Sequence, residues 1–248
     1  YSTYWAPLFT KISTTDSDAV QQYRAIGIDV IKTQWAANTN LYKPRTNNGY
    51  IYDITFVGKN YGNRGNYIQF LKNCRLPESA SSVVPAKVDG FGKGWDGGVV
   101  SFEKMLEIFS NSKINLNFTE SAFHFKKELA KLFIKKSLGK YYFNALNFFN
   151  NFSSMAGKLR PQIKGRTFEV PACGGFLLTG DADNLGDYYE DGKEIVVFKN
   201  KHDLFEKCRF YLYHAAEREA VAKAGFKRTM KDHSYEQRFT EIFKAMGL

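Results

Sequence analysis

The sequence lacks several features that would quickly assign it to a class of protein. Its 248 residues contain only three cysteines, Cys74, Cys173 and Cys208, with no CxxC pair and no spacing typical of a disulfide framework. This favours a reducing, cytoplasmic setting. The four histidines show no metal-ligand spacing, so we expect no metal site built on them. No apolar run approaches the roughly 20 residues that span a bilayer, and there is no internal repeat.

What is present indicates a folded protein with one unusual segment. Hydrophobic residues make up 44% of the chain and charged residues 24%, which suits one large domain or one domain plus part of another. The chain opens at Tyr1 without a methionine, and we interpret it as a fragment or a trimmed product. The net charge is +10, and residues 122–166 alone hold ten Lys or Arg against one acid, Glu128. Such a concentrated excess indicates a local role rather than a basic surface for nucleic acid.

The order of expected elements predicts the fold class. Residues 1–47 read as the remnant of another domain and a linker, with a short helix from Asp16 to about Ala25. From residue 48 onward, short β-branched or aromatic strands alternate with helices, which predicts a Rossmann-like α/β domain: a parallel sheet with helices on both faces. Three helices are expected at the end of the chain. The second should stop at Gly225, and Ser234 should cap the third.

Ligands of open parallel sheets bind beyond the carboxyl ends of the strands, and the loop 58–65 follows the first strand of this domain. Its glycines, Gly58 among them, permit close approach of the backbone to a ligand. Asn60 and Arg64 complete this candidate site, because an Arg can clamp a phosphate in two-point fashion. The alternative is a polar turn with a solvated Arg64.

A second loop, 89–98, contains five glycines in ten residues. A nucleotide base could bond to the main chain near Val99 and Val100, and it could stack on Phe91 or Trp95. Both rings could equally well be packing residues.

The loop 164–175 carries the strongest signal. Lys164 and Arg166 precede a predicted helix, where a cation does nothing for the helix dipole, and Glu169 lies in its first turn. The pattern is suited to a diphosphate covered by the two cations, with the carboxylate accepting bonds from vicinal sugar hydroxyls. Gly174, after the helix, completes the candidate site. The alternative is that Glu169 serves only the dipole while the cations are solvated.

Three runs in this order, Arg166–Thr179, Tyr188–Glu194 and Asp232–Arg238, resemble the C-terminal domain of CgeB-like glycosyltransferases, which are relatives of the GT-B class. The resemblance covers about 50–121 and 163–248. It implies that Glu169 binds the donor ribose and that Lys164 and Arg166 neutralise the diphosphate. It also implies a nucleotide-diphosphate sugar as donor, most simply a UDP-sugar, and no metal or other cofactor.

Two features depart from or compete with that family pattern. The wider class has a second carboxylate eight residues before Glu169, where this chain has Pro161, so the group that contacts the donor sugar is missing or supplied elsewhere. Asp181 and Asp183 form an Asp-x-Asp sequence, which we interpret as a turn rather than a metal site.

The basic segment, about residues 120–162, is expected to be a helical insertion in the domain 48–248. Lys127, Lys131 and Lys135 repeat at a spacing of four opposite an apolar face. It would pack on the domain with a solvated Lys face, or dock on an anionic membrane through 122–150. No nucleic-acid motif is present.

The sequence therefore predicts a glycosyltransferase in which this chain mainly supplies the donor-binding domain and residues 1–47 belong to the acceptor domain. The acceptor would be a glycan, a lipid-linked molecule or a protein, and the catalytic base stays unassigned. The alternatives are a non-catalytic nucleotide-sugar-binding or scaffold domain, or a basic module that binds membrane or nucleic acid. We expect a cytoplasmic protein or one peripheral at the inner face of the membrane.

Overall fold

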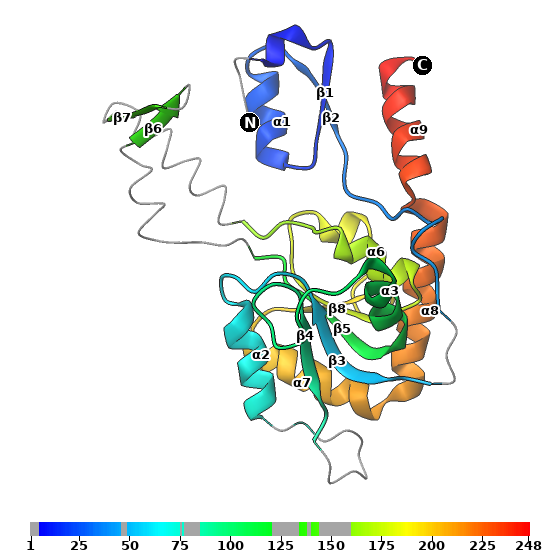
Figure 1. Ribbon diagram of the computed structural model, residues 1–248. Helices are drawn as coiled ribbons and strands as arrows, with labels where there is room; N and C mark the ends of the chain where they lie inside the picture. Colours follow the sequence, from blue (N-terminus) through cyan, green and yellow to red (C-terminus); the bar gives the residue numbers. More distant parts are fainter. Residues whose placement is uncertain are drawn as a thin grey trace.

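The computed structural model of the chain has a five-stranded parallel sheet as its centre (Figure 1). The strands lie in the order β4-β3-β5-β8-β9, so the order reverses between β3 and β5. Their bounds are β3 Tyr52–Val57, β4 Val88–Phe91, β5 Ser112–Asn117, β8 Leu177–Gly180 and β9 Val196–Phe198. The residues that the structure describes are 5–45, 49–74, 76, 85–120, 134–137, 140–143 and 160–248.

Helices cover both faces of this sheet, as the alternating pattern predicts. Two apolar clusters show the arrangement. In one, Ile68 of α2 and Leu204 of α7 pack against β3, β5 and β9; in the other, Phe109 of α3 and Phe168 of α6 pack on the opposite face. The helices run as α2 Arg64–Asn73, α3 Phe102–Asn111, α6 Arg166–Ala172, α7 Lys201–Tyr213 and α8 Ala215–Asp232. The Rossmann-like fold class is therefore confirmed.

Polar side chains inside the sheet are paired with one another, which removes the cost of burying them. Asn117 on β5 donates to the hydroxyl of Thr179 on β8 at 3.0 Å and to that of Thr167 on α6 at 3.3 Å. These bonds connect the first turn of α6 to the carboxyl end of the central strand, β5. Arg166 and Glu169 belong to the same short helix as Thr167, so they also lie at this end of the sheet.

The N-terminal residues form a separate small unit. Strands β1 (Lys11–Thr14) and β2 (Asp29–Lys32) are parallel, and α1 (Ser17–Arg24) joins them over a cluster of its own. Asp16 caps α1, because its side chain accepts from the backbone of Asp18 at 2.9 Å. The capped helix in this region is thus confirmed.

The last helix, α9 (Tyr235–Met246), runs from the main body toward this unit (Figure 1). Lys11 on β1 donates to the carbonyl oxygen of Ala245 at 2.6 Å. At the other end of α9, Ala37 forms an isolated parallel bridge with Ser234, which also caps the helix in a capping box. Two contacts between residues far apart in the sequence therefore connect the N-terminal segment with the last helix.

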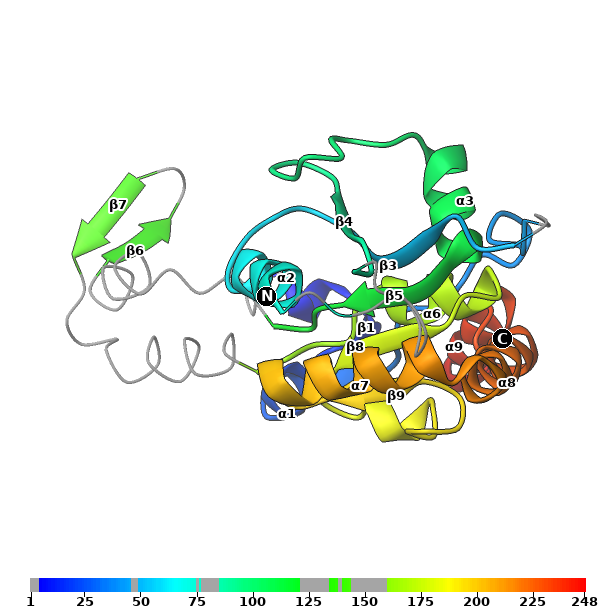
Figure 2. The same ribbon diagram turned by 90° about the horizontal axis from the view of Figure 1, so that it is seen from below.

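Two sequence predictions about local structure are wrong. Helix α8 continues through Gly225, which does not have a left-handed backbone. Instead, a Cβ atom there would collide with the carbonyl oxygen of Glu194, so the glycine permits close packing. In the basic segment, β6 (Ile134–Ser137) and β7 (Lys140–Phe143) form an antiparallel hairpin, and Lys135 lies on a strand rather than on a helix. This hairpin projects from the body in both views (Figure 2). Lys127 and Lys131 lie outside the described residues.

Candidate functional site

The candidate site lies at the carboxyl ends of β3 and β5, where the strand order reverses. Two arginines mark the place. Arg166 donates from Nε to the carbonyl oxygen of Val57 at 3.0 Å, and Arg64 donates to that of Phe118 at 3.3 Å. Val57 ends β3, and Phe118 directly follows β5. In open α/β sheets, such a reversal leaves the crevice in which ligands bind.

Arg64 begins α2 and closes the loop after β3 onto the end of β5. Besides Phe118, its guanidinium donates to the carbonyl oxygen of Lys59 at 3.0 Å and to the hydroxyl of Tyr61 at 2.7 Å. The residue is 9% exposed, and within the described part of the chain its Nε has no hydrogen-bond partner. Burial lowers the pKa of Arg64, and the charge of Arg166 adds to this effect. Most of its donors therefore serve the fold, and among the described residues no carboxylate forms an ion pair with it, although Glu120 lies near enough to raise its pKa slightly against these effects.

Lys164 is the third cation of this cluster. It is half-buried, and burial followed by repulsion from Arg64 lowers its pKa. Among the described residues, neither Lys164 nor Arg64 forms an ion pair with a carboxylate. Burying like charges together is unfavourable unless an opposite charge joins them. The arrangement therefore favours a bound anion.

Arg166 and Glu169 form the one ion pair of this cluster in the described residues, with Nη1 and Oε2 separated by 2.7 Å. The carboxylate folds back toward the start of α6, where a Cβ on Gly165 would lie 3.0 Å from its Oε1. Tyr42, in the segment before β3, lies close enough that burial and then the charge of Glu169 raise the pKa of its hydroxyl. The structure thus brings together Lys164, Arg166 and Glu169, as the sequence pattern predicts, and adds Tyr42.

Gly58 and Asn60 hold the first two loops of the site together. The backbone nitrogen of Gly58 donates to the carbonyl oxygen of Phe91 at 2.8 Å, and Gly58 accepts from the indole of Trp95 at 2.8 Å. The side-chain nitrogen of Asn60 donates to the carbonyl oxygen of Gly94 at 3.1 Å. These bonds explain why the loops carry glycines: their backbones approach each other closely. Both residues therefore lie at the site, and their hydrogen bonds join its two loops to each other.

The two rings considered for base stacking are engaged in packing. Trp95 lies against Gly90, where a Cβ would be 2.7 Å from its ring, and edge-on to Phe56 at 5.7 Å. Phe91 packs edge-on to Tyr52, with ring centroids 5.8 Å apart. Both rings are therefore part of the packing around the strand ends.

Val99 and Val100 directly precede α3, on the same edge of the sheet as Glu169. Val99 is 80% exposed, whereas Val100 packs against the cluster beneath α3 and α6. Ser101 caps α3 by accepting from the backbone of Lys104 at 3.1 Å. At the start of α3, the ring of Phe102 packs edge-on to that of Tyr42, with centroids 5.5 Å apart.

Gly174 lies apart from the other candidate residues. It follows the end of α6 with φ +73°, and a Cβ there would contact Pro44 at 3.4 Å. Its neighbour Cys173 accepts a bond from Ser110 at the end of α3, at 3.1 Å. Gly174 therefore lies at the opposite end of α6 from Arg166, where it terminates the helix.

A small cavity of about 90 Å³ opens beside the cations, at the carboxyl ends of β5, β8 and β9. Pro161, where the family pattern leads us to expect a carboxylate, lines it together with Glu120 and Asp181. Glu120 accepts from the hydroxyl of Tyr67 at 3.3 Å. Acidic groups are therefore close to the position of Pro161, although they come from other loops. The sequence gives no sign of this, because Glu120 and Pro161 are 41 residues apart.

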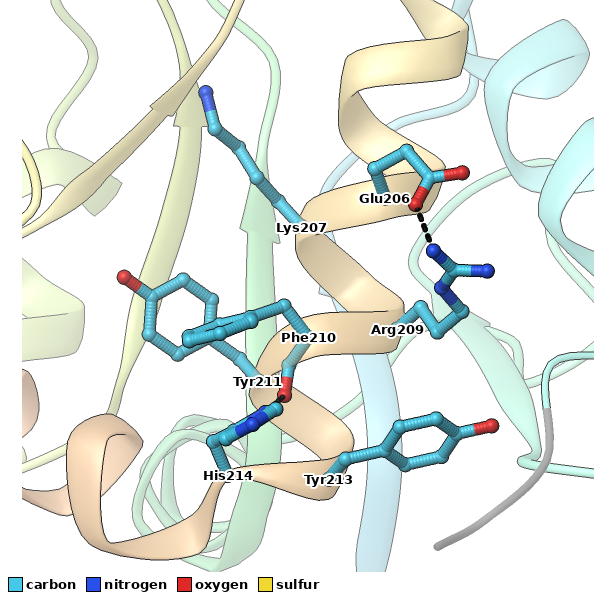
Figure 3. Close-up of a pocket in the computed structure, with 7 residues that line it drawn as sticks. All are labelled: Glu206, Lys207, Arg209, Phe210, Tyr211, Tyr213 and His214. Carbon is cyan, nitrogen blue, oxygen red and sulfur yellow. Dashed lines mark hydrogen bonds and ion pairs between the residues drawn. The ribbon is translucent and has the colours of Figure 1, made fainter. Parts of the chain in front are cut away.

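A larger, open depression of about 650 Å³ lies on α7 and contains none of the predicted site residues (Figure 3). The exposed ring of Phe210 stacks on His214 with centroids 4.0 Å apart, and Arg209 pairs with Glu206 on the far side of the helix. This half of α7 faces the amino edge of the sheet. Its position makes it unsuitable for a ligand held at the strand reversal.

The sequence of residues 64–244 matches the family described as glycosyl transferase-like. The chain belongs to this family. No protein of curated function matches the chain in sequence. In the described part of the chain, no helix has both the length and the apolar character needed to cross a membrane.

Several solved glycosyltransferase structures share the fold at very low sequence identity. Sucrose-phosphate synthase from Thermosynechococcus elongatus is 8% identical with a TM-score of 0.61, covering 95% of this chain and 57% of that one. A glycosyltransferase from Rickettsia africae is 9% identical with a TM-score of 0.61, covering 99% and 66%. Anabaena Alr3699/HepE in complex with UDP-glucose is 8% identical with a TM-score of 0.60, covering 96% and 64%. The chain thus spans less than two thirds of the length of each, and what it shares with them is the fold.

Proposed function

We propose that this chain binds the nucleotide-diphosphate sugar of a glycosyltransferase reaction, at the strand reversal between β3 and β5. The observation that carries the proposal is the group of Arg64, Lys164 and Arg166, in which Arg166 alone forms an ion pair among the described residues, with Glu169. Glu120 lies near Arg64 without pairing with it. Arg64 and Lys164 therefore keep positive charge in a half-buried place, and a diphosphate would neutralise it. Family membership gives this anion its chemical context.

Within this site, each residue has a distinct role. Glu169 would accept bonds from the vicinal ribose hydroxyls, the backbone at Val99 and Val100 would contact the base, and Lys164 and Arg166 would hold the diphosphate. The sugar would then point toward the small cavity beside Glu120 and Pro161. UDP is the first nucleotide to test, because a relative of the same fold was solved with UDP-glucose.

The reaction would be attack by an acceptor hydroxyl on the anomeric carbon of the donor. The bond between that carbon and the diphosphate oxygen breaks, and the nucleoside diphosphate leaves with the electron pair. Positive charge placed where the leaving group develops negative charge stabilises the transition state. We assign the small unit of residues 5–37 to the acceptor side, and we propose that the chain is related to CgeB-like enzymes.

The test is calorimetric titration of the chain with UDP, GDP and UDP-sugars, repeated with Glu169→Ala and Arg166→Ala. We expect saturable binding of one nucleotide that both substitutions weaken. Lys223→Met is the matched control, because Lys223 is an exposed cation on α8, and it should bind like the parent chain. A well-folded parent chain that binds no nucleotide would refute the proposal. Binding without sugar transfer to any acceptor would favour a non-catalytic domain.

A second candidate, docking on an anionic membrane, has one structural observation in its favour. Tyr142 and Phe143 on the hairpin β6–β7 are 51% and 78% exposed, in a segment rich in lysine. Aromatic side chains beside basic residues suit the headgroup region of a membrane. Flotation with vesicles containing phosphatidylserine should recover the chain, and Tyr142→Ser with Phe143→Ser should abolish recovery. Equal recovery of parent and variant would exclude this role for the hairpin.

A further inference from the structure

The small cavity beside the cations has an aromatic floor. Three of its lining residues, Tyr67, Phe118 and Phe198, pack on one another with ring centroids 5.3 to 6.0 Å apart. Tyr67 belongs to α2, Phe118 directly follows β5 and Phe198 ends β9, so three separate elements fix the rings in place. A group that enters the cavity therefore meets an apolar surface.

A carboxylate lies at the edge of this floor. Oε1 of Glu120 accepts from the hydroxyl of Tyr67 at 3.3 Å, and both residues line the cavity. Burial and then the charge of Glu120 raise the pKa of Tyr67, so its phenol keeps the proton that it donates. A carboxylate offers about four acceptor positions, and Tyr67 occupies one of them. Because Glu120 is exposed, other positions are open to a ligand.

The cavity adjoins the cation cluster on two sides. Phe118 lines it, and the carbonyl oxygen of the same residue accepts from Arg64 at 3.3 Å. Pro161 also lines it and precedes Lys164 by three residues. A diphosphate held by Arg64 and Lys164 would therefore carry its sugar to the mouth of the cavity.

The volume of the cavity, about 90 Å³, limits what can enter it. A water molecule in the liquid takes up about 30 Å³, so the space suits a group of about four bonded non-hydrogen atoms. Gly180 sets one wall, where a Cβ would lie 2.8 Å from the hydroxyl oxygen of Thr119. A whole sugar ring is too large for this space, and a single hydroxyl would leave most of it empty. The cavity therefore fits a substituent of the sugar.

The chemistry of the lining narrows the substituent further. Glu120 and Asp181 disfavour an anionic group such as a carboxylate. A bare amine could pair with Glu120, but it is too small to cover the aromatic floor. An acetamido group has both features that the cavity requires: an N–H that donates to a carboxylate and a methyl group that packs on rings.

We propose that this cavity is a subsite for the acetamido substituent of the donor sugar, in which Glu120 accepts the amide N–H and the rings of Tyr67 and Phe198 contact the methyl group. The subsite rests on the proposed function, since only a bound donor would bring a sugar to it. It names the substrate class as nucleotide-activated N-acetylhexosamines. It also makes Glu120, which lies outside the loop 164–175, a residue that determines specificity.

The experiment is calorimetric titration of the parent chain with UDP and with two pairs of donors. UDP-glucose is compared with UDP-N-acetylglucosamine, and UDP-galactose with UDP-N-acetylgalactosamine. Within each pair, an acetamido group replaces one hydroxyl. In at least one pair we expect the N-acetylated donor to bind about tenfold more tightly, the size of one hydrogen bond to a charged group.

The same titrations with Glu120→Ala test the assigned residue. The ratio of the two affinities should fall toward one, because the amide N–H loses its acceptor. Glu219→Ala is the matched control, since Glu219 is an exposed glutamate on α8, and it should keep the ratio of the parent chain. UDP-glucosamine and UDP-glucuronic acid complete the set of probes.

Several outcomes would overturn the subsite while the parent chain still binds UDP. One is the absence of any preference for the N-acetylated donor in both pairs; another is a preference that Glu120→Ala leaves intact. Tightest binding of UDP-glucosamine would indicate an amine subsite instead, and tightest binding of UDP-glucuronic acid an anion subsite. Failure of the parent chain to bind UDP itself would refute the proposed function, so the two failures are distinguishable.

Discussion

The Nε of Arg166 lies 3.0 Å from the carbonyl oxygen of Val57, while Nη1 of the same guanidinium pairs with Glu169 at 2.7 Å. One side chain thus joins the end of β3 to the first turn of α6. The planar fork of an Arg permits both bonds at once, whereas the single ammonium of a Lys cannot reproduce this geometry. Arg166 therefore orders the site in addition to supplying charge.

This geometry predicts that Arg166→Lys is not a conservative change. We expect UDP affinity to fall about tenfold or more, because loss of a charge-assisted bond to Glu169 costs about 1.5–3 kcal/mol. Titration of the parent chain, Arg166→Lys and Arg166→Met measures the effect. If Arg166→Lys bound UDP as tightly as the parent chain, charge alone would be sufficient at this position.

Lys164 should show opposite effects on binding and on stability. Burial and repulsion from Arg64 both lower its pKa in the free chain, so its charge is unfavourable until an anion binds. We expect Lys164→Met to weaken UDP binding and to leave the thermal midpoint of the free chain unchanged or higher. Melting curves with and without UDP test both statements. A lower midpoint in the free chain would show that Lys164 has a stabilising partner.

Much of the fold was predictable because its signals are local. The loop 58–65 directly follows a strand, Tyr52–Val57, and the helix Tyr235–Met246 begins directly after its predicted cap, Ser234, since β-branched runs and capping residues act over a few neighbours. The three residues Lys164, Arg166 and Glu169 were also predictable as a group, because they lie within one turn of helix and its preceding loop. These features needed no knowledge of the rest of the chain.

The remaining features depend on contacts between distant segments. Tyr42 lies in a segment without periodicity, and only the packing of that segment on α3 and α6 brings it to Glu169. Gly225 resembles a helix stop in the sequence, yet its function is set by Glu194 on another segment. Likewise, the donors of Arg64 are mostly occupied by Lys59, Tyr61 and Phe118, which its place in a glycine-rich loop does not reveal.

His233 predicts a dependence of stability on pH. Its Nε2 lies 2.7 Å from the carbonyl oxygen of Tyr188, and its Nδ1 lies 3.2 Å from the guanidinium of Arg238, which can only donate. The neutral ring with a proton on Nε2 satisfies both contacts. Burial lowers the pKa of His233, and the charges of Arg238 and Arg228 lower it further.

The direction of the pH dependence follows from comparing the pKa of His233 in the folded and unfolded chains. The unfolded chain binds a proton at His233 near pH 6.5, before the folded chain does, so the free energy of unfolding decreases as the pH falls below about 6.5. The slope from this residue is at most about 1.4 kcal/mol per pH unit. Denaturant titrations between pH 5 and 7.5 should show the decrease in the parent chain and a smaller one in His233→Gln. Parallel profiles would mean that His233 does not titrate between the two states.

Gly225 provides a test in which two effects have opposite signs. In the interior of an ordinary helix, Gly→Ala is stabilising by about 1 kcal/mol because alanine restricts the unfolded chain and favours the helix. In α8, however, the added methyl group would meet the carbonyl oxygen of Glu194, which is backbone and cannot rotate away. Overpacking of this kind costs about 1–3 kcal/mol. We therefore expect Gly225→Ala to lower the free energy of unfolding.

Gly186→Ala is the matched control, since no atom lies within 4 Å of a Cβ at that position, and it should change stability little. A more stable Gly225→Ala would show that α8 can move away from Glu194, and that the close contact between the two segments is not required by the fold.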